Sequence, residues 1–492
     1  MDAFWNFVAL LSGFIWGGAW GDRTILPPYA SPMVVMLLGG GLFFMIRLGF
    51  RPLTRLFPAF AELWAGRKAK AGSDGEITPW QALSTALSGQ VGTGNLAGVA
   101  TAITLGGPGA IFWMWVTALF GMAAAFAESS LAVRFRERHP DGRIHGGPMY
   151  YIENGLGKNW KWLAIFFCIG TLFSALATGG MIQANSITQA VGETGRQLNL
   201  AIPDWGVGLA IAVLVFAVII GGIKSIGSVA GRVVPFMAVA YVICALVVLL
   251  LHANLVPQAF ILIFQSAFGI EEVWGGVAGY SLAAAIRYGV ARGLFSNEAG
   301  QGSAPIAHAA AKTNNPVKQG EIAMIGVFID TMIICTMTAL VILVVGAEVG
   351  PDGTIMFASW LNDGLAASAI TTAAYSEGIP GGEWIVTVSL FVFAFTTIIG
   401  WSYYAEQAIT YLVGDWAAKP FRYVWVVVIF IGALQPVDAI WRLGDLANAS
   451  MAIPNIIAIV ALSGVVVAMA KAADEARAKG EEYKVETRFD ES

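Results

Sequence analysis

Two short polar segments lie inside long apolar runs of this chain, and their residue types could bind ions. The first is the run LSGQVGTGNLAG at 87–98, and the second is FSNEAGQGSAP at 295–305. Glycine destabilises a helix, so repeated glycines within an apolar run predict that the helix is broken there. The N-terminal end of a half-helix offers N–H groups to an anion, and carbonyls freed by the break suit a hard cation. The two segments together predict a site for a zwitterion bound with a cation such as Na+.

A second explanation is that the glycines only allow two helices to cross closely. Against this, the two segments carry polar side chains at matching positions, namely Gln90, Thr93, Asn95, Ser296, Asn297 and Glu298. Polar and ionisable groups within a membrane helix mark a functional site by default. We therefore favour a binding site over simple helix packing.

The composition indicates that the elements around these segments are membrane helices. The chain is 57% hydrophobic and 12% charged, whereas a soluble domain has about 25% charged residues. A helix broken in lipid must line a polar cavity, because lipid cannot satisfy the freed backbone groups. The net charge of -4 argues against a nucleic-acid partner, and the three cysteines form no CxxC pair. We expect no metal centre and no bound cofactor, with Na+ only as a transported ion.

Apolar stretches long enough to cross a hydrocarbon core of about 30 Å predict the membrane spans. We count eleven, at 27–47, 78–104, 109–134, 162–192, 205–222, 232–252, 279–311, 321–347, 383–413, 422–441 and 446–470. Stretches 253–275 and 352–372 are too polar to span and are expected to form external helices. The segment 1–26 lacks the features of a signal peptide, and its tryptophans predict a helix at the membrane interface.

The spans divide into two sets of five, at 78–252 and 279–470, preceded by one membrane helix at 27–50 and followed by a tail at 471–492. Because five is odd, the second set should be inverted relative to the first. The predicted fold class is an all-α polytopic membrane protein with about 11 transmembrane helices in a 5+5 inverted repeat. Glycine-interrupted segments at corresponding positions of two such halves are typical of a secondary transporter.

Lysine and arginine cluster in alternate loops, and such loops usually face the cytoplasm. The loops after 27–47 and after 109–134 are the most basic. This pattern predicts an external N-terminus and a cytoplasmic C-terminus in a bacterial cytoplasmic membrane. The chain has no GxxxxGK[ST] and no HExxH sequence, so we expect neither a P-loop ATP motor nor a zinc peptidase. A channel or a membrane-embedded enzyme stays as the alternative class.

The chain resembles the alanine or glycine:cation symporter family over roughly residues 25–470. The motifs that carry the resemblance are GQVGTGNLAGVATA at 89–102, GGPGAIFWMW at 106–115, GGPMYY at 146–151, GGIKSIG at 221–227, GLFSNEAGQGSAPIAHAAAKT at 293–313 and WSYY at 401–404. The resemblance implies the fold of the bacterial leucine transporter with one added N-terminal helix. It also implies import of small neutral amino acids, chiefly alanine and glycine, coupled to Na+. Coupling to H+ and another substrate such as glutamine or serine stay as alternatives.

We predict a substrate site around the two breaks. The backbone amides of Thr93 and Gly94 should hold a carboxylate, with Asn95 nearby. Gln183 resembles the family's substrate-contacting glutamine, and Phe295 and Trp401 should enclose the side chain. The full predicted substrate set is Gln90, Thr93, Gly94, Asn95, Gln183, Phe295, Ser296, Asn297 and Trp401.

The cation site is implied by the resemblance, since this fold pairs carbonyls before the first break with hydroxyls of a later helix. The corresponding groups here are the carbonyls of Ser88 and Val91 and the hydroxyls of Thr396 and Thr397. A threonine in a membrane helix often donates to its own i−4 carbonyl instead.

Several charged groups lie within the predicted spans. Glu298 lies at the second break, and Arg287 and Arg292 precede it. We predict a structural or gating role for Glu298 and Arg292, with proton exchange as the alternative. Three further carboxyls could be gates, proton sites or packing contacts: Glu128, Asp330 and Glu406.

Overall fold

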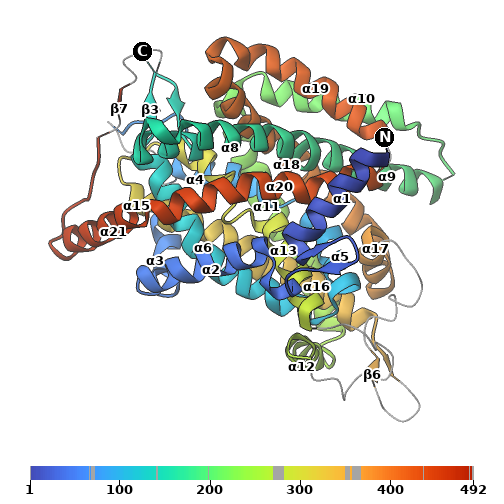
Figure 1. The fold of residues 1–492 in the computed structure, drawn as a ribbon. Helices are drawn as coiled ribbons and strands as arrows, with labels where there is room; N and C mark the ends of the chain where they lie inside the picture. The colour runs from blue at the N-terminus through green and yellow to red at the C-terminus, as the bar shows by residue number, and fades with distance from the viewer. Residues whose placement is uncertain are drawn as a thin grey trace.

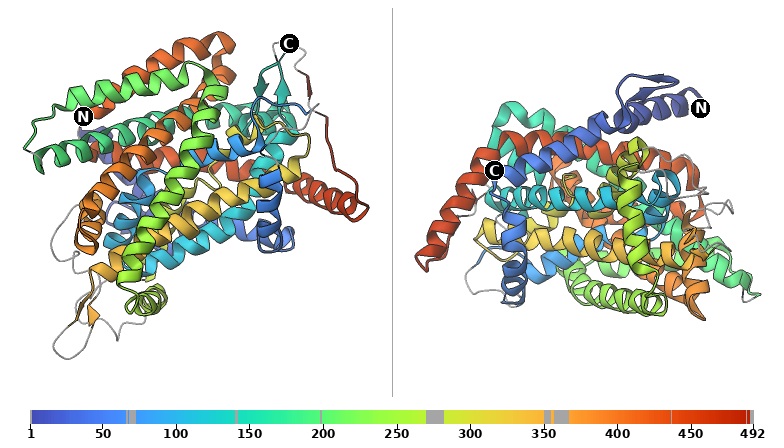
Figure 2. Two further views of the ribbon diagram at one scale, coloured as in Figure 1. Left: turned by 180° about the vertical axis from the view of Figure 1, so that it is seen from behind. Right: turned by 90° about the horizontal axis from the view of Figure 1, so that it is seen from below.

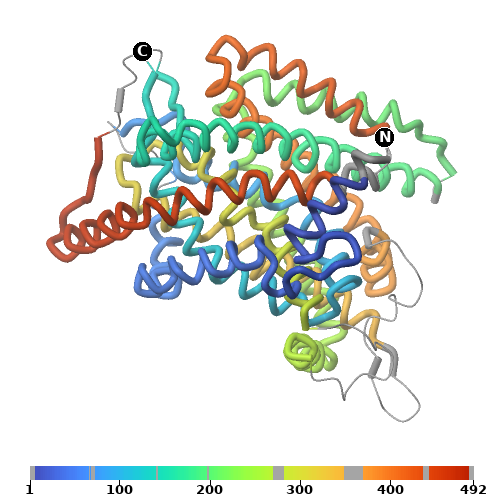
Figure 3. Tube along the Cα trace, in the orientation of Figure 1, coloured from blue at the N-terminus to red at the C-terminus, as the bar shows by residue number. Residues whose placement is uncertain are grey.

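The computed structural model describes residues 2–65, 67, 73–139, 142–197, 199–269, 282–349, 355–356, 367–435, 437–486 and 488–489. Helices account for almost all of this part of the chain, as the ribbon shows (Figure 1). The tube in Figure 3 follows the same path by residue number.

The helices that form the body of the protein are α1 (Asp2–Gly17), α2 (Pro32–Arg47), α3 (Arg51–Ala65), α4 (Pro79–Gln90), α5 (Ala97–Gly106), α6 (Gly109–Arg134), α7 (Pro148–Tyr151), α8 (Lys161–Ser174), α9 (Ile182–Gln197), α10 (Asp204–Ile219), α11 (Gly222–Leu251), α12 (Val256–Ala267), α13 (Leu282–Asn297), α14 (Ala304–Ala309), α15 (Pro316–Val327), α16 (Thr336–Val345), α17 (Ala367–Gly378), α18 (Gly382–Val413), α19 (Ala418–Leu434), α20 (Val437–Ala461) and α21 (Ser463–Ala478). Short 3-10 turns are η1 (Pro28–Ala30), η2 (Thr93–Asn95), η4 (Lys158–Trp160) and η9 (Asp415–Ala417). Three π-helical segments are η3 (Ile152–Leu156), η5 (Ala175–Met181) and η7 (Phe328–Cys335).

Short strand pairs lie in the loops. β1 (Ala19–Trp20) pairs with β2 (Arg23–Thr24), and β5 (Glu348–Val349) pairs with β6 (Ile355–Met356). β3 (Glu137–Arg138) pairs antiparallel with β4 (Ile144–His145) and parallel with β7 (Arg488–Phe489). The last sheet joins the C-terminal tail to the loop after α6.

The two predicted breaks are present, and they divide two helices that run in opposite directions. The first broken helix consists of α4, η2 and α5, and the second consists of α13 and α14. α4 packs against α14, whereas α5 packs against α13. Pairing the first half of one helix with the second half of the other requires an antiparallel arrangement.

The helices that follow each break also pack against their counterparts. α6 contacts α15, α9 contacts α18, and α10 contacts α19. The last of these pairs forms a separate layer at the top of Figure 1. The same layering is visible from behind in Figure 2. This is the arrangement that an inverted repeat predicts, although the division into two five-helix units stays a prediction.

Within the described residues, seven continuous helices have the length and apolar composition of a membrane span. An eighth is obtained if α2 and α3, which are bent by 78° at their junction, count as one. The other predicted spans are α10, which has 16 residues, and the two broken helices, whose pieces are each too short. The multi-span helical fold is thus confirmed, and the breaks explain why a length criterion finds fewer spans.

The stretches predicted to be external contain helices α12 and α17. The parts of these stretches at 270–275, 352–354 and 357–366 lie outside the described residues. In the N-terminal segment, α1 packs along α20, as Figure 1 shows. Trp16 is buried there, and its Nε1 donates to the carbonyl of Asp445 at 3.0 Å. Trp16 therefore anchors α1 to the helical body.

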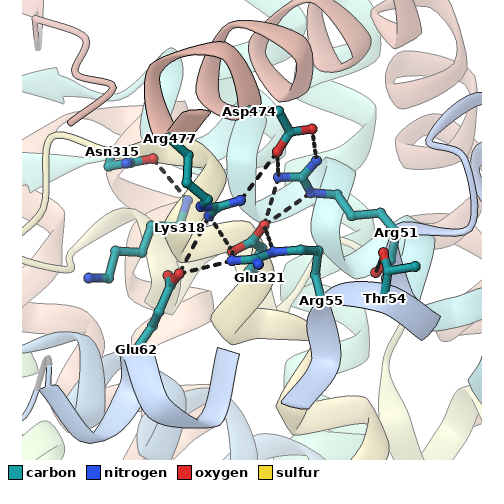
Figure 4. A network of polar contacts seen from close by, with 9 residues as sticks. All are labelled: Arg51, Thr54, Arg55, Glu62, Asn315, Lys318, Glu321, Asp474 and Arg477. Carbon is teal, nitrogen blue, oxygen red and sulfur yellow. Dashed lines mark hydrogen bonds and ion pairs between the residues drawn. The ribbon is translucent and has the colours of Figure 1, made fainter. Parts of the chain in front are cut away.

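An ionic network joins three elements at the end of the protein that carries the basic loops (Figure 4). Glu321 of α15 is fully buried and accepts from Arg51 of α3 at 2.7 Å. It also pairs with Arg55 at 3.1 Å and with Arg477 of α21 at 3.2 Å. Arg51 reaches Asp474 of α21 at 2.8 Å. A buried carboxylate is expensive unless it is paired, so these contacts fix α3 and α21 against α15.

Candidate binding site between the two broken helices

The first break begins where α4 ends, and two side chains accept hydrogen bonds from the backbone amides that the break exposes. α4 starts with a capping box, in which Thr78 and Gln81 each satisfy the other's backbone amide. After Gln90 the chain leaves the helix, and Asn95 Oδ1 accepts from the Gly92 N–H at 2.9 Å. The Thr93 N–H donates to Gln183 Oε1 at 3.2 Å. The side chains of Asn95 and Gln183 therefore satisfy amides that the break exposes.

The second break is held by its own side chains and by glycine. Glu298, Gly300 and Gly302 all have positive φ values of 56°, 87° and 87°, a conformation that favours glycine. Asn297 Oδ1 accepts from the Ala299 N–H at 3.0 Å, and Glu298 Oε2 accepts from Ser303 Oγ at 2.5 Å. α14 then restarts with proline in its first turn, where a missing N–H costs nothing.

A small cavity with an open volume of about 10 Å³ lies between the two breaks. Its walls come from both broken helices and from α18, η5, α9 and α20. The lining residues are Gly89, Gln90, Gly92, Gly94, Thr178, Gln183, Phe295, Glu298, Gln301, Thr397, Trp401 and Asn448. A volume of this size has room for about one water molecule, so binding of a larger solute requires the walls of the cavity to move apart.

The structure brings part of the predicted substrate set to this cavity. Gln90, Gly94, Gln183, Phe295 and Trp401 line it, as do the predicted gating residue Glu298 and the predicted cation ligand Thr397. Three predicted substrate residues direct their side chains to other partners: Asn95 and Ser296 to Asp330, and Asn297 to Thr331. Thr93 contributes its backbone N–H to Gln183.

Gln183 links the first break to the π-helical segment of the next wall. Its Nε2 donates to the Thr178 carbonyl at 3.0 Å, while its Oε1 accepts from Thr93. The i→i+5 pattern of a π-helix places residues five apart on one face, which explains why Thr178 and Gln183 both face the cavity. The amide oxygen of Gln183 accepts a hydrogen bond from the Thr93 N–H, which was predicted to donate to a substrate carboxylate.

Two aromatic side chains close the cavity, and glycines make room for them. A Cβ at Gly179 would lie 2.4 Å from Trp401 Cγ, and a Cβ at Gly94 would lie 3.0 Å from Phe295 Cδ1. Only the absence of a side chain at these positions allows the rings to approach so closely. The aromatic walls limit the size of any side chain that can enter.

The two predicted cation-site threonines have different environments. Thr397 Oγ1 lies 3.3 Å from the Val91 carbonyl at the first break, and it also donates to the Phe393 carbonyl at 3.0 Å. Thr396 Oγ1 donates to the Phe393 carbonyl at 2.9 Å and lies 3.6 Å from Met237 Sδ of α11. Ser88 Oγ donates to the Thr85 carbonyl at 2.7 Å. Thr397 is the hydroxyl that reaches the first break.

Arg292 does not need Glu298 as a partner, because it pairs with Asp445 at 2.6 Å. Its guanidinium also lies 5.5 Å from the centroid of the Phe295 ring, within cation–π range. Glu298 instead bonds Ser303 and faces the cavity. Each of the two predicted gating residues thus has a partner other than the other one.

Five lining residues were not among the predicted site residues: the glycines Gly89 and Gly92 and the polar residues Thr178, Gln301 and Asn448. Gln301 Nε2 donates to Asn448 Oδ1 at 3.1 Å, and Ser174 Oγ donates to the same oxygen at 2.7 Å. Gln301 lies inside the second glycine-rich segment, and Asn448 is an amide in an apolar span, so their polarity was a signal. Thr178 carried no comparable signal.

The family model described as the sodium:alanine symporter family matches residues 24–487. The chain belongs to this family. It is therefore a transporter and not an enzyme, as the sequence predicted.

Curated relatives are similar over nearly the whole chain. The sodium/alanine symporter AgcS of Methanococcus maripaludis is 42% identical over 476 residues, covering 96% of this chain and 98% of that protein. The putative sodium/proton-dependent alanine carrier protein YrbD of Bacillus subtilis is 38% identical, covering 93% and 90%. The probable sodium/glutamine symporter GlnT of Bacillus subtilis is 36% identical, covering 89% and 87%.

Among solved structures, the chain is similar to MhsT in complex with L-phenylalanine. The TM-score is 0.56 at 13% identity, covering 81% of this chain and 93% of that chain. At this identity the match shows the fold alone, and it confirms the predicted leucine-transporter fold for this family member.

A second, larger cavity of about 240 Å³ lies further along α18, toward the basic loops. Tyr403, Glu406, Gln407 and Thr410 of α18 line one side of it. Its other walls carry charged groups from loops, α11 and α19: Glu76, Arg143, Lys224 and Arg422. Arg422 and Glu406 form a pair across it at 2.7 Å. This polar space lies on the same helix as Thr397 and Trp401.

Proposed function

We propose that this transporter imports small neutral amino acids, alanine and glycine foremost, together with Na+. The observation that carries the proposal is the small polar cavity enclosed between two antiparallel broken helices. Its polar groups suit an ammonium and a carboxylate, and its aromatic walls at Phe295 and Trp401 favour a small side chain. The name of the relative AgcS, a sodium/alanine symporter, supports the same substrate and ion.

For the cation we propose a site at the first break, formed by the carbonyls of Ser88 and Val91 and the hydroxyl of Thr397. Carbonyl and hydroxyl oxygens are the ligands that a hard cation prefers. The 3.3 Å approach of Thr397 Oγ1 to the Val91 carbonyl supports this assignment. Thr396 is the weaker member of the predicted set, because its hydroxyl contacts Met237 and its own helix.

We place the protein in a bacterial cytoplasmic membrane with the N-terminus outside and the C-terminus inside. The concentration of arginine and lysine in the loops around α3 and β3 supports this orientation. The larger cavity then faces the cytoplasm. Because it lies on the same helix as Thr397 and Trp401, we propose that it is part of the route by which substrate leaves the site.

A second candidate is a carrier of glutamine, since the relative GlnT is named a probable sodium/glutamine symporter. The name of YrbD, a putative sodium/proton-dependent alanine carrier, keeps H+ as an alternative coupling ion. The close packing of Trp401 against Gly179 and of Phe295 against Gly94 favours alanine and glycine over glutamine.

The test is uptake of radiolabelled alanine into liposomes that contain the purified protein. An inward Na+ gradient should drive concentrative uptake, and an inward K+ gradient should not. Unlabelled glycine should compete, while glutamine should compete weakly. Uptake of glutamine without uptake of alanine would contradict the substrate assignment, and uptake driven by a pH gradient alone would contradict Na+ coupling. Accumulation of no solute in competent vesicles would contradict the proposed symport.

A further inference from the structure

A buried carboxylate outside the cavity contacts both helix breaks. Asp330 lies in η7, and its side chain is fully buried. Its Oδ1 accepts from Asn95 Nδ2 at 2.6 Å, and its Oδ2 accepts from Ser296 Oγ at 2.7 Å. Asn95 belongs to the first break, and Ser296 is in the last turn of α13 at the second. One side chain from a third span thus joins the two interrupted helices.

The hydrogen bond between Asn95 and Asp330 has a defined donor and acceptor. Asn95 Oδ1 accepts from the Gly92 N–H at 2.9 Å, and a backbone N–H can only donate. The amide of Asn95 is therefore oriented with its Nδ2 toward Asp330, which removes the usual ambiguity between the two amide atoms. A relay runs from the Gly92 amide through Asn95 to the carboxylate.

A second relay reaches Asp330 from the other break. The Ala299 N–H donates to Asn297 Oδ1 at 3.0 Å, so Asn297 Nδ2 points to Thr331 Oγ1 at 3.1 Å. Thr331 Oγ1 then donates its only proton to Asp330 Oδ2 at 2.8 Å. Both relays start at a backbone amide of a break and end as donors to the same carboxylate.

A second residue of η7, Cys335, contacts the same two side chains, Asn95 and Ser296. Cys335 lies five residues after Asp330, and a π-helix places such residues on one face. The sulfur of Cys335 lies 3.3 Å from Asn95 Nδ2 and 3.2 Å from Ser296 Oγ. Loss of the carboxylate would leave several oriented buried donors without an acceptor, and buried networks lose more than one bond when a central member is removed.

We propose that Asp330 is a positioning residue that holds the two breaks together as one unit. A movement of either break is transmitted to the other through its carboxylate. This coupling affects transport only if substrate binds between the breaks, so that part of the proposal rests on the proposed function.

The first test is hydrogen–deuterium exchange of the purified protein without substrate, followed by mass spectrometry of peptides covering 87–97 and 294–303. Asp330→Asn should increase the exchange rate of both peptides by about tenfold or more, because the carboxylate bonds residues of both breaks. A tenfold change corresponds to about 1.4 kcal/mol. Thr331→Val interrupts only the second relay, so it should affect only the second peptide. Thr338→Val is the matched control, because this buried hydroxyl of the same span bonds Tyr241 at 2.6 Å and should leave both peptides unchanged.

A change in one peptide only, or in neither, with Asp330→Asn would overturn the proposal. If Asp330→Asn accelerates exchange throughout the protein, the Thr331→Val variant tests the proposal instead. Faster exchange in the second peptide alone supports the relay through Thr331, and unchanged exchange in that peptide overturns the proposal.

The second readout is the KM for alanine, which Asp330→Asn should raise by about tenfold or more, with Thr338→Val unchanged. An unchanged KM would overturn the role in transport. A wild-type protein that does not transport alanine would instead contradict the proposed function, and the exchange result would still decide whether Asp330 joins the breaks.

Discussion

At the scale of single residues, several glycines of the site are explained by the side chain that packs against them. The position of Cβ at Gly92 would be 2.5 Å from Thr397 Oγ1, and at Gly179 it would be 2.4 Å from Trp401 Cγ. Both contacts join a wall of the cavity to α18. Glycine at these positions therefore sets the distance between α18 and its neighbours.

Gly179→Ala should displace the Trp401 ring and weaken alanine binding by about tenfold or more, because overpacking costs about 1–3 kcal/mol. The measurement is the KM for alanine in proteoliposomes. Gly192→Ala is the matched control, since this glycine lies in α9 of the same span and a Cβ there would meet nothing within 4 Å. Equal KM values for the two variants would exclude the proposed fit between Gly179 and Trp401.

Thr397→Ala removes the hydroxyl nearest the Val91 carbonyl. The Na+ concentration for half-maximal uptake should rise by about three- to tenfold, since a ligand of this kind contributes about 1 kcal/mol. Thr396→Ala is the adjacent control, and its hydroxyl faces Met237, so its Na+ dependence should stay close to that of the wild type. Unchanged Na+ dependence in Thr397→Ala would remove this residue from the cation site.

At the scale of elements, helix interruptions place the polar groups of the site. The two broken helices expose backbone groups, and two π-helical segments turn polar residues toward them. η5 brings Thr178 and Gln183 to one face, and η7 does the same for Asp330 and Cys335. π-Helical turns are frequent at functional sites, and here η5 and η7 lie in two of the spans that contact the breaks.

The ionic network at the basic end makes the attachment of α21 dependent on pH. Partial burial acts to raise the pKa of Asp474, but the hydrogen bonds and charge of Arg51 outweigh it, so the pKa is lowered overall. A lowered pKa means that the folded protein favours the ionised form. The stabilisation is therefore present above the ordinary aspartate pKa of about 3.9 and is lost as the pH falls below it.

The corresponding prediction compares the thermal unfolding midpoints of the wild type and Asp474→Asn in detergent. The wild type should be more stable at neutral pH, and the difference should shrink as the pH falls below about 4 and disappear below the lowered pKa of Asp474. The effect should be small, because the Asp474 side chain is 52% exposed. A difference that persists in acid would show that the charge of Asp474 does not hold α21.

At the scale of the whole molecule, corresponding helices of the two predicted halves contact one another. The broken helices pair antiparallel, and the next helices pair as α6 with α15, α9 with α18, and α10 with α19. Such pairing places the breaks at the centre of the protein, where movement of one half against the other can open either side of the cavity.

The predicted orientation can be tested with reporter fusions in bacterial cells. Green fluorescent protein fused after residue 492 should fluoresce, because it folds on the cytoplasmic side, while alkaline phosphatase at the same position should be inactive. A fusion of each reporter after residue 254, in the loop between α11 and α12, should give the opposite result. An active phosphatase at the C-terminus would reverse the proposed topology.

The sequence by itself determined the membrane class, the family and the places where two helices are broken. These properties follow from local composition, since apolar length, glycine content and clustered polar residues within a segment need no knowledge of its neighbours. Gln90, Gly94, Gln183, Phe295, Glu298 and Trp401, which were named from the sequence, all line one cavity, and their roles stay predictions.

Only the tertiary structure decided which polar groups face the cavity and which bind one another. Thr396 and Thr397 are adjacent in the sequence, but a helix directs neighbouring side chains to different faces. The Thr396 hydroxyl therefore contacts Met237 of α11, and the Thr397 hydroxyl contacts the Val91 carbonyl at the end of α4. Asn95 and Ser296 were expected at the substrate, yet both bind Asp330, a residue more than 30 positions away in each case. Such partners depend on contacts between distant spans and on π-helical turns that change the exposed face, and neither is encoded in local periodicity.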